Sequence, residues 1–174
     1  MNATEMYNLE KQNSAENHKN VTAGAMVGHV ISNLSINQNK IRQISIFHKD
    51  IDISFTNYLN ELAQNEQKYI ENLSIKLISE NEIIPTTTEE FLENTMLKES
   101  GSLKYEQSTT KISELIQDFD TQLMFIIRAI VLAKNEQKYG LELLLKKLYS
   151  FMKRQITTLQ FQINNDVSQG LEEE

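Results

Sequence analysis

The sequence predicts an all-α protein, because it has few turn-forming residues and several long apolar stripes with helical spacing. Its 174 residues contain five glycines and one proline, where average usage would give about 21 of the two together. A β-sandwich or barrel needs frequent turns, so this composition argues against an all-β fold. The length fits one domain with a single core.

Residues 1–22 form a polar extension with few large apolar side chains, which could be a short exposed helix or a disordered tail. The bundle itself is expected over residues 23–165. Its first helix should run from about Ala25 to His48, where apolar residues recur at spacings of three, four and seven. The residues that mark this helix face are Val27, Val30, Ile31, Leu34, Ile41 and Ile44.

The second helix is expected from about Ser54, which is a plausible N-cap, to Glu80. A single charged residue, Glu66, interrupts its apolar stripe. We expect Glu66 at the edge of the bundle, paired with a lysine or arginine, in preference to a role as metal ligand. After a proline, Thr87-x-x-Glu90 matches a capping box and predicts a short helix in the connection that follows.

The third and fourth long helices are expected over about 103–134 and 139–163, with Gly140 marking the turn between them. Residues 166–174 carry four acidic side chains and no basic one, which predicts an acidic tail that frays. Four amphipathic helices, with one long connection that contains a small helix, are typical of a ferritin-like four-helix bundle.

Composition excludes several classes of function. The chain has no cysteine, so disulfides, thiolate zinc sites and thiol nucleophiles are ruled out. Its net charge of −7 argues against a general affinity for nucleic acids. The longest apolar run, 124–133, is too short to span a bilayer, and the polar N-terminus shows no secretory signal. We therefore expect a cytoplasmic protein without a membrane partner.

The segment from Leu73 to Leu92 reads LSIKLISENEIIPTTTEEFL and resembles the stretch of Dps proteins that leads from their second helix into their small connecting helix. Dps proteins (DNA-binding proteins from starved cells) are mini-ferritins, and the resemblance covers roughly residues 25–165. It implies a hollow homododecameric shell, associated with the nucleoid, that binds DNA without sequence specificity through its N-terminal extensions. Such a shell would protect DNA under starvation or oxidative stress.

The resemblance also implies a ferroxidase site between two subunits, and this chain departs from its ligand set. The two histidines of the family would fall near Ser45 and Thr56, and its aspartate near Asn60. The acids of the partner subunit would fall near Glu71 and Ile75, so that only Glu71 keeps a metal-binding side chain. We expect no catalytic residues and a degenerate site, with iron as the one cofactor that the resemblance implies. The alternative is an iron-storing mini-ferritin with ferroxidase activity at an unconventional site.

The residues themselves, apart from the resemblance, also argue against a conventional di-iron site. Larger ferritin-like di-iron sites use Glu-x-x-His pairs on helices, and this sequence contains none. Imidazole and carboxylate groups are close together in sequence at only two places, and neither spacing is specific for a metal. These places are His18 with Glu16, and His48 with Asp50 and Asp52. We expect His29, which lies beside the first apolar stripe, to be packed or hydrogen-bonded.

In the family, lysines of the N-terminal extension bind DNA, and here they correspond to Lys11 and Lys19. Three glutamates and the terminal amine bring the extension close to neutrality, so each chain could make few phosphate contacts. Parallel contacts from many subunits would raise the affinity. A solvated tail with no role in DNA binding is the alternative.

Glu142, at the start of the fourth helix, falls where the family usually has an acidic residue of its threefold pores. The resemblance therefore implies that Glu142 lines a pore that guides cations into the shell. The alternative is an ordinary acid at a helix N-terminus, where the helix dipole favours it.

Overall fold

The computed structural model describes residues 1–19, 21–47 and 52–171, and within these ranges it contains helices and no strand. It confirms the all-α prediction. The elements are α1 (Ala3–Lys19), α2 (Ala23–Ile46), α3 (Ile53–Ser79), α4 (Thr88–Asn94), the 3-10 turn η1 (Leu103–Tyr105), α5 (Ser108–Asn135) and α6 (Tyr139–Gln162). No helix in these ranges is long and apolar enough to cross a bilayer.

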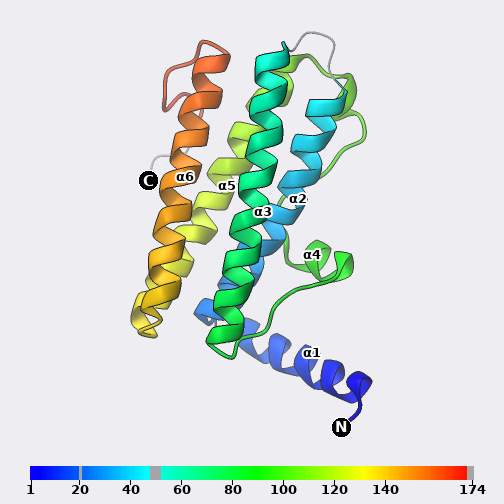
Figure 1. The fold of residues 1–174 in the computed structure, drawn as a ribbon, viewed down its shortest axis with the longest axis vertical. Helices are drawn as coiled ribbons and strands as arrows, with labels where there is room; N and C mark the ends of the chain where they lie inside the picture. Colours follow the sequence, from blue (N-terminus) through cyan, green and yellow to red (C-terminus); the bar gives the residue numbers. More distant parts are fainter. Residues whose placement is uncertain (20, 48–51, 172–174) are drawn as a thin grey trace.

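The four long helices form a bundle in which α2 packs against α3 and α5, and α5 packs against α6 (Figure 1). Figure 1 shows α2 and α6 running in one direction along the bundle and α3 and α5 in the other. The segment between α3 and α5 travels the length of the bundle and carries α4 and η1. This long crossover confirms the ferritin-like arrangement.

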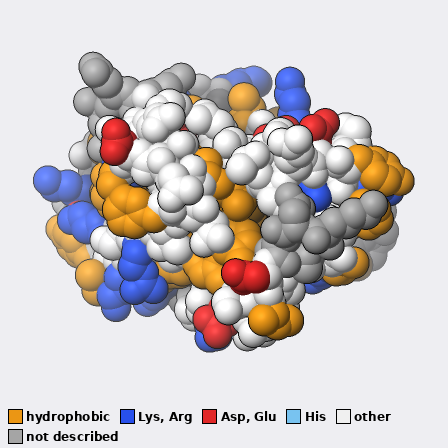
Figure 2. Space-filling model, turned by 90° about the horizontal axis from the view of Figure 1, so that it is seen from above, with side chains coloured by type: hydrophobic (Ala, Val, Ile, Leu, Met, Phe, Trp, Pro, Cys, Tyr) orange, Lys and Arg blue, Asp and Glu red, His pale blue; other side chains and the backbone are white. Residues whose placement is uncertain are grey.

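The predicted apolar stripes line the core. All six stripe residues of the first helix are at most 2% exposed, and α5 contributes the fully buried Phe119. Complete burial of each such side chain stabilises the fold by about 1.5–3 kcal/mol. Apolar side chains also reach the surface, including at the end of the bundle where α2 ends and α3 begins (Figure 2). Exposed examples from that end are Ile46, Ile53 and Tyr105.

Side-chain caps define where the helices begin. The capping box is confirmed, because Thr87 Oγ1 accepts from the Glu90 amide and Glu90 Oε2 accepts from the Thr87 amide. The Ser54 prediction was wrong by two residues. Asp52 is the N-cap of α3 and its Oδ1 accepts from the Phe55 amide at 2.8 Å. Aspartate serves this position as well as serine does, so residue type alone did not separate the two.

Two predicted features of the third and fourth helices were wrong. The helix expected from residue 103 is interrupted, because η1 ends at Tyr105 and α5 begins only at Ser108. Gly140 lies inside α6, and the turn before it uses Gln137, whose φ is 59°. The small size of Gly140 matters for packing, since a Cβ there would lie 3.3 Å from Lys76 Nζ.

Both ends of the chain are ordered where they are described. Of the two alternatives for the extension, the helix is observed, and α1 projects from one end of the bundle (Figure 1). The expected fraying from residue 166 is not seen as far as residue 171. The Gln169 and Gly170 carbonyls accept hydrogen bonds from Gln160 and Gln117, and Leu171 packs against the core.

Candidate functional site

The positions inferred for a ferroxidase site carry no imidazole. Ser45 is buried on α2, where its hydroxyl donates to the Arg42 carbonyl at 3.0 Å. On α3, Asn60 and Ile75 are exposed. Glu71 is also exposed, and its Oε1 accepts from Gln67 Nε2 at 2.9 Å. Within the described part of the chain, no three or more histidine, aspartate or glutamate side chains gather into a metal-binding group.

Of the three histidines, the structure describes the side chain of His29 alone. The side chain of His18, and residues His48 and Asp50, lie outside the part that the structure describes, while Asp52 caps α3. The prediction for His29 is confirmed, because its Nδ1 donates to the Asn94 carbonyl at 2.6 Å. The ring of His29 also packs against Phe125, with 5.8 Å between centroids.

The extension forms α1 because its first turn is capped from both sides. The Asn2 side chain accepts from the Glu5 amide, and the Glu5 carboxylate accepts from the Asn2 amide, each at 2.9 Å. Both candidate DNA-binding lysines are exposed. Lys19 Nζ lies 3.4 Å from the Glu16 carboxylate, and Lys11 Nζ lies 5.0 Å from the centre of the Tyr7 ring. Each lysine is thus close to a neighbour on its own helix, in a contact weak enough to exchange.

The Glu90 carboxylate of α4 links α1 to the rest of the structure. Tyr7 donates its hydroxyl proton to Glu90 Oε1 at 3.0 Å, across 83 residues of sequence. Partial burial raises the pKa of Glu90, but hydrogen bonds from Thr86 and Thr87 outweigh this and hold the pKa below its usual value. An ionised Glu90 is a strong acceptor, so the Tyr7 contact is a charge-assisted hydrogen bond.

Glu142 lies in the first turn of α6, as expected. Its carboxylate is 2.6 Å from Lys146 Nζ, one turn further along the same helix, and its side chain is 12% exposed. The pair is of the i,i+4 kind that stabilises an isolated helix slightly. A pore role would therefore require Glu142 to attract cations while Lys146 offsets part of its charge.

The interior of the bundle holds a carboxylate that sequence reasoning placed elsewhere. Glu66 is fully buried, so the predicted ion pair at the bundle edge was wrong. Its Oε1 accepts from Asn37 Nδ2 at 2.7 Å. Burial raises the pKa of Glu66 to about 8, although the Asn37 hydrogen bond lowers it and nearby Asp118 raises it further. At neutral pH the protonated form of Glu66 is therefore favoured.

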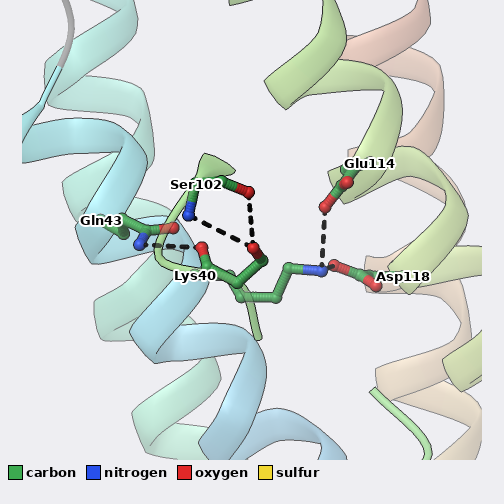
Figure 3. A network of polar contacts seen from close by, with 6 residues as sticks. Lys40, Gln43, Ser102, Glu114 and Asp118 are labelled. Atoms are coloured by element: carbon green, nitrogen blue, oxygen red, sulfur yellow. Dashed lines mark hydrogen bonds and ion pairs between the residues drawn. The ribbon is translucent and has the colours of Figure 1, made fainter. Parts of the chain in front are cut away.

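On α2, about one helical turn after Asn37, a buried lysine bridges α2 and α5 (Figure 3). Lys40 is 4% exposed, and its ammonium contacts the Asp118 carboxylate and lies 3.4 Å from that of Glu114. Burial raises the pKa of Asp118 to about 6, even though Lys40 lowers it. Sequence reasoning missed this pair, and the available signal was that Lys40 immediately precedes Ile41 of the apolar stripe.

Comparison with solved structures gives close matches over nearly the whole chain. The chain is 37% identical to Lactococcus lactis DpsB, with a TM-score of 0.91, covering 95% of this chain and 96% of that one. It is 31% identical to DpsA of the same organism, with a TM-score of 0.92 and coverages of 97% and 99%. Dps from Listeria monocytogenes is 16% identical, with a TM-score of 0.80 and coverages of 84% and 96%, which shows the shared fold. No family model and no curated protein matches the chain.

Proposed function

The chain belongs to the Dps family of mini-ferritins, and from this premise we propose that it binds and protects DNA as a hollow homododecameric shell. Binding is independent of sequence and serves the nucleoid in the cytoplasm under starvation or oxidative stress. The observation that carries the proposal is α1, a helix outside the bundle that exposes Lys11 and Lys19.

The electrostatics of α1 support weak, multiple contacts. Its two lysines and the terminal amine are balanced by three glutamates, so one chain neutralises few phosphates and binds weakly. The salt dependence grows with the number of phosphates contacted, so it is shallow for one chain and steep for a shell of many chains. Twelve extensions on one particle act in parallel, and the second and later contacts form at a high effective concentration. Neutral amides such as Asn13 and Asn17 add phosphate contacts without charge.

Exposed apolar side chains support the assembly. On α5, Met124, Ile127 and Val131 are between 37% and 53% exposed and follow one helix face. Ile75 and Ile78 are exposed in the same way near the end of α3. Exposed large apolar side chains on successive turns of a helix are typical of interfaces between subunits.

The altered ligand set supports a shell without a conventional ferroxidase centre. A non-haem iron site needs imidazole and carboxylate ligands with open positions, and the inferred positions offer only the exposed Glu71. Iron binding at Glu71, and cation entry past Glu142, remain parts of the proposal that separate variants can test. Iron oxidation at an unconventional site is the alternative function.

Two measurements test the proposal. Twelve chains of 20.1 kDa give a particle of about 240 kDa, measurable by light scattering. In a gel-shift series the shell should retard plasmid at low salt, and the double variant Lys11→Gln/Lys19→Gln should weaken binding and reduce the salt dependence. The matched control is Lys146→Gln/Lys147→Gln on α6, which removes the same charge outside the extension. Equal losses in both variants would contradict the α1 assignment.

For the alternative, ferric absorbance is followed after adding Fe(II) and peroxide. The proposal expects oxidation no faster than in buffer. Faster oxidation that is lost in Glu71→Ala would establish the iron enzyme instead.

A further inference from the structure

Three polar side chains on three different helices are buried in the bundle and have unused hydrogen-bonding atoms. Asn37 on α2, Glu66 on α3 and Gln122 on α5 are each at most 1% exposed. Within the described chain, Asn37 Oδ1, Glu66 Oε2, and both Oε1 and Nε2 of Gln122 have no hydrogen-bond partner. Buried polar atoms are nearly always partnered in folded proteins, so this group calls for a bound species.

The helix register places these side chains at one level of the bundle. Asn37 and Glu66 are hydrogen-bonded at 2.7 Å. Because Lys40 pairs with Asp118 across α2 and α5, which run in opposite directions (Figure 1), an earlier position on α2 faces a later position on α5. Asn37 precedes Lys40 by three residues and Gln122 follows Asp118 by four, so the two are level.

Most of the unused atoms are possible ligands of a cation. Three of them are oxygens, two from amides and one from a carboxylate, which are the donors that hard divalent ions such as Mg²⁺ and Mn²⁺ prefer. The nearby ammonium of Lys40 already serves Asp118 and Glu114. Glu66 thus has no cationic partner in the described chain, which agrees with the raised pKa of this carboxyl group.

A row of polar side chains on α5 connects this level with solvent. Glu114, Asp118 and Gln122 are spaced four residues apart, which places them on one face of the helix. Their exposure falls along the row, from 49% for the Glu114 side chain through 12% for Asp118 to 1% for Gln122. The row thus runs from the surface to the level of Glu66, and its two carboxylates also hold the Lys40 ammonium.

We propose that Glu66, with the amide oxygens of Asn37 and Gln122, binds one hard divalent cation inside each chain, its remaining ligands being water. This site lies within one bundle. It is separate from Glu71, from Glu142 and from the inferred positions between subunits.

The test is a titration of the full-length, chelator-treated shell with Mn²⁺, followed by electron paramagnetic resonance. The wild-type protein should bind one tight Mn²⁺ per chain, in addition to any weak surface ions. Glu66→Gln keeps the size and the Asn37 contact but removes the charge, so it should weaken this site by about tenfold or more. The matched control Glu61→Gln removes an exposed acid of the same helix and should leave the site unchanged.

A second variant works in the opposite direction and does not depend on how well Glu66→Gln folds. Gln122→Glu adds a carboxylate at the same level and should tighten Mn²⁺ binding by about tenfold. The proposal is overturned if wild type binds no tight Mn²⁺, if Glu66→Gln binds as wild type does, or if Gln122→Glu gives no gain. A loss in Glu61→Gln as large as in Glu66→Gln would show that the ion binds at the surface of the helix and would also overturn the proposal. Plasmid binding measured on the same samples reports on the proposed function independently.

Discussion

Helix α1 and the centre of the bundle use charged residues in opposite ways. On α1 the lysines are exposed, and they make only weak contacts with neighbouring side chains, such as that of Lys19 with Glu16. In the centre, Glu66 and Lys40 are buried, where each charge is costly unless it is partnered. Removing one contact on α1 should therefore change the free energy of unfolding little. Replacing one buried charged group in the centre should change it substantially.

The largest test of this contrast is the pH dependence of the free energy of unfolding, measured by urea titration with a chelator present. Glu66 has a pKa of about 8 in the folded chain against 4.5 ordinarily, so the folded state binds the extra proton. The contribution of Glu66 to stability is fully present below about pH 4.5 and is lost as the pH rises towards 8, by roughly 3–4 kcal/mol between pH 5 and pH 8.

In Glu66→Gln most of this dependence should disappear. What remains should have the same sign, since the pKa of Asp118 is also raised, to about 6. A wild-type protein that gains stability over the same pH range would contradict the buried, uncompensated state of Glu66.

A slightly smaller effect is expected when the buried lysine loses its closest partner. Asp118→Ala leaves Lys40 with only the half-exposed Glu114 at 3.4 Å, so the free energy of unfolding should fall by about 3 kcal/mol. Glu114→Gln is the control and should cost less than about 1 kcal/mol. Equal costs for the two variants would show that Lys40 does not distinguish its two partners.

The helices of the bundle could be predicted from the sequence, whereas the buried polar groups between them could not. Apolar residues at helical spacing predicted the four long helices, because periodicity reports which face of a helix is buried. The same periodicity says nothing of what a helix packs against. Asn37 and Glu66 are 29 residues apart, and only the packing of α2 on α3 brings them together, so the burial of Glu66 could not be predicted.

The errors at element ends have a similar cause. Leu103 is buried and so fitted the apolar pattern of the helix that follows, although it belongs to η1. Gly140 was taken for a turn residue because glycine tolerates positive φ, yet Gln137 has that conformation. Local residue preferences were correct for the capping box of α4, where all the interacting groups lie within four residues.

Between the two regions, Gly24 should give an intermediate effect. A Cβ at this position would clash with the Glu82 carboxylate, so Gly24→Ala forces this carboxylate to move and disturbs its ion pair with Lys138. We expect a loss of about 1–2 kcal/mol in the free energy of unfolding. Gly101→Ala, where nothing lies within 4 Å of the added Cβ, should change stability little. A neutral Gly24→Ala would mean that this ion pair is dispensable.

The smallest effect belongs to the attachment of α1. Tyr7→Phe removes the hydroxyl that binds Glu90 but keeps the ring next to Lys11, so that only this one hydrogen bond is lost. Because α1 lies outside the bundle, the loss should appear as faster amide hydrogen exchange in residues 3–19, with the exchange of α5 unchanged. Faster exchange throughout the bundle would show that α1 unfolds together with the core, and the contrast between exposed helix and buried centre would then be lost.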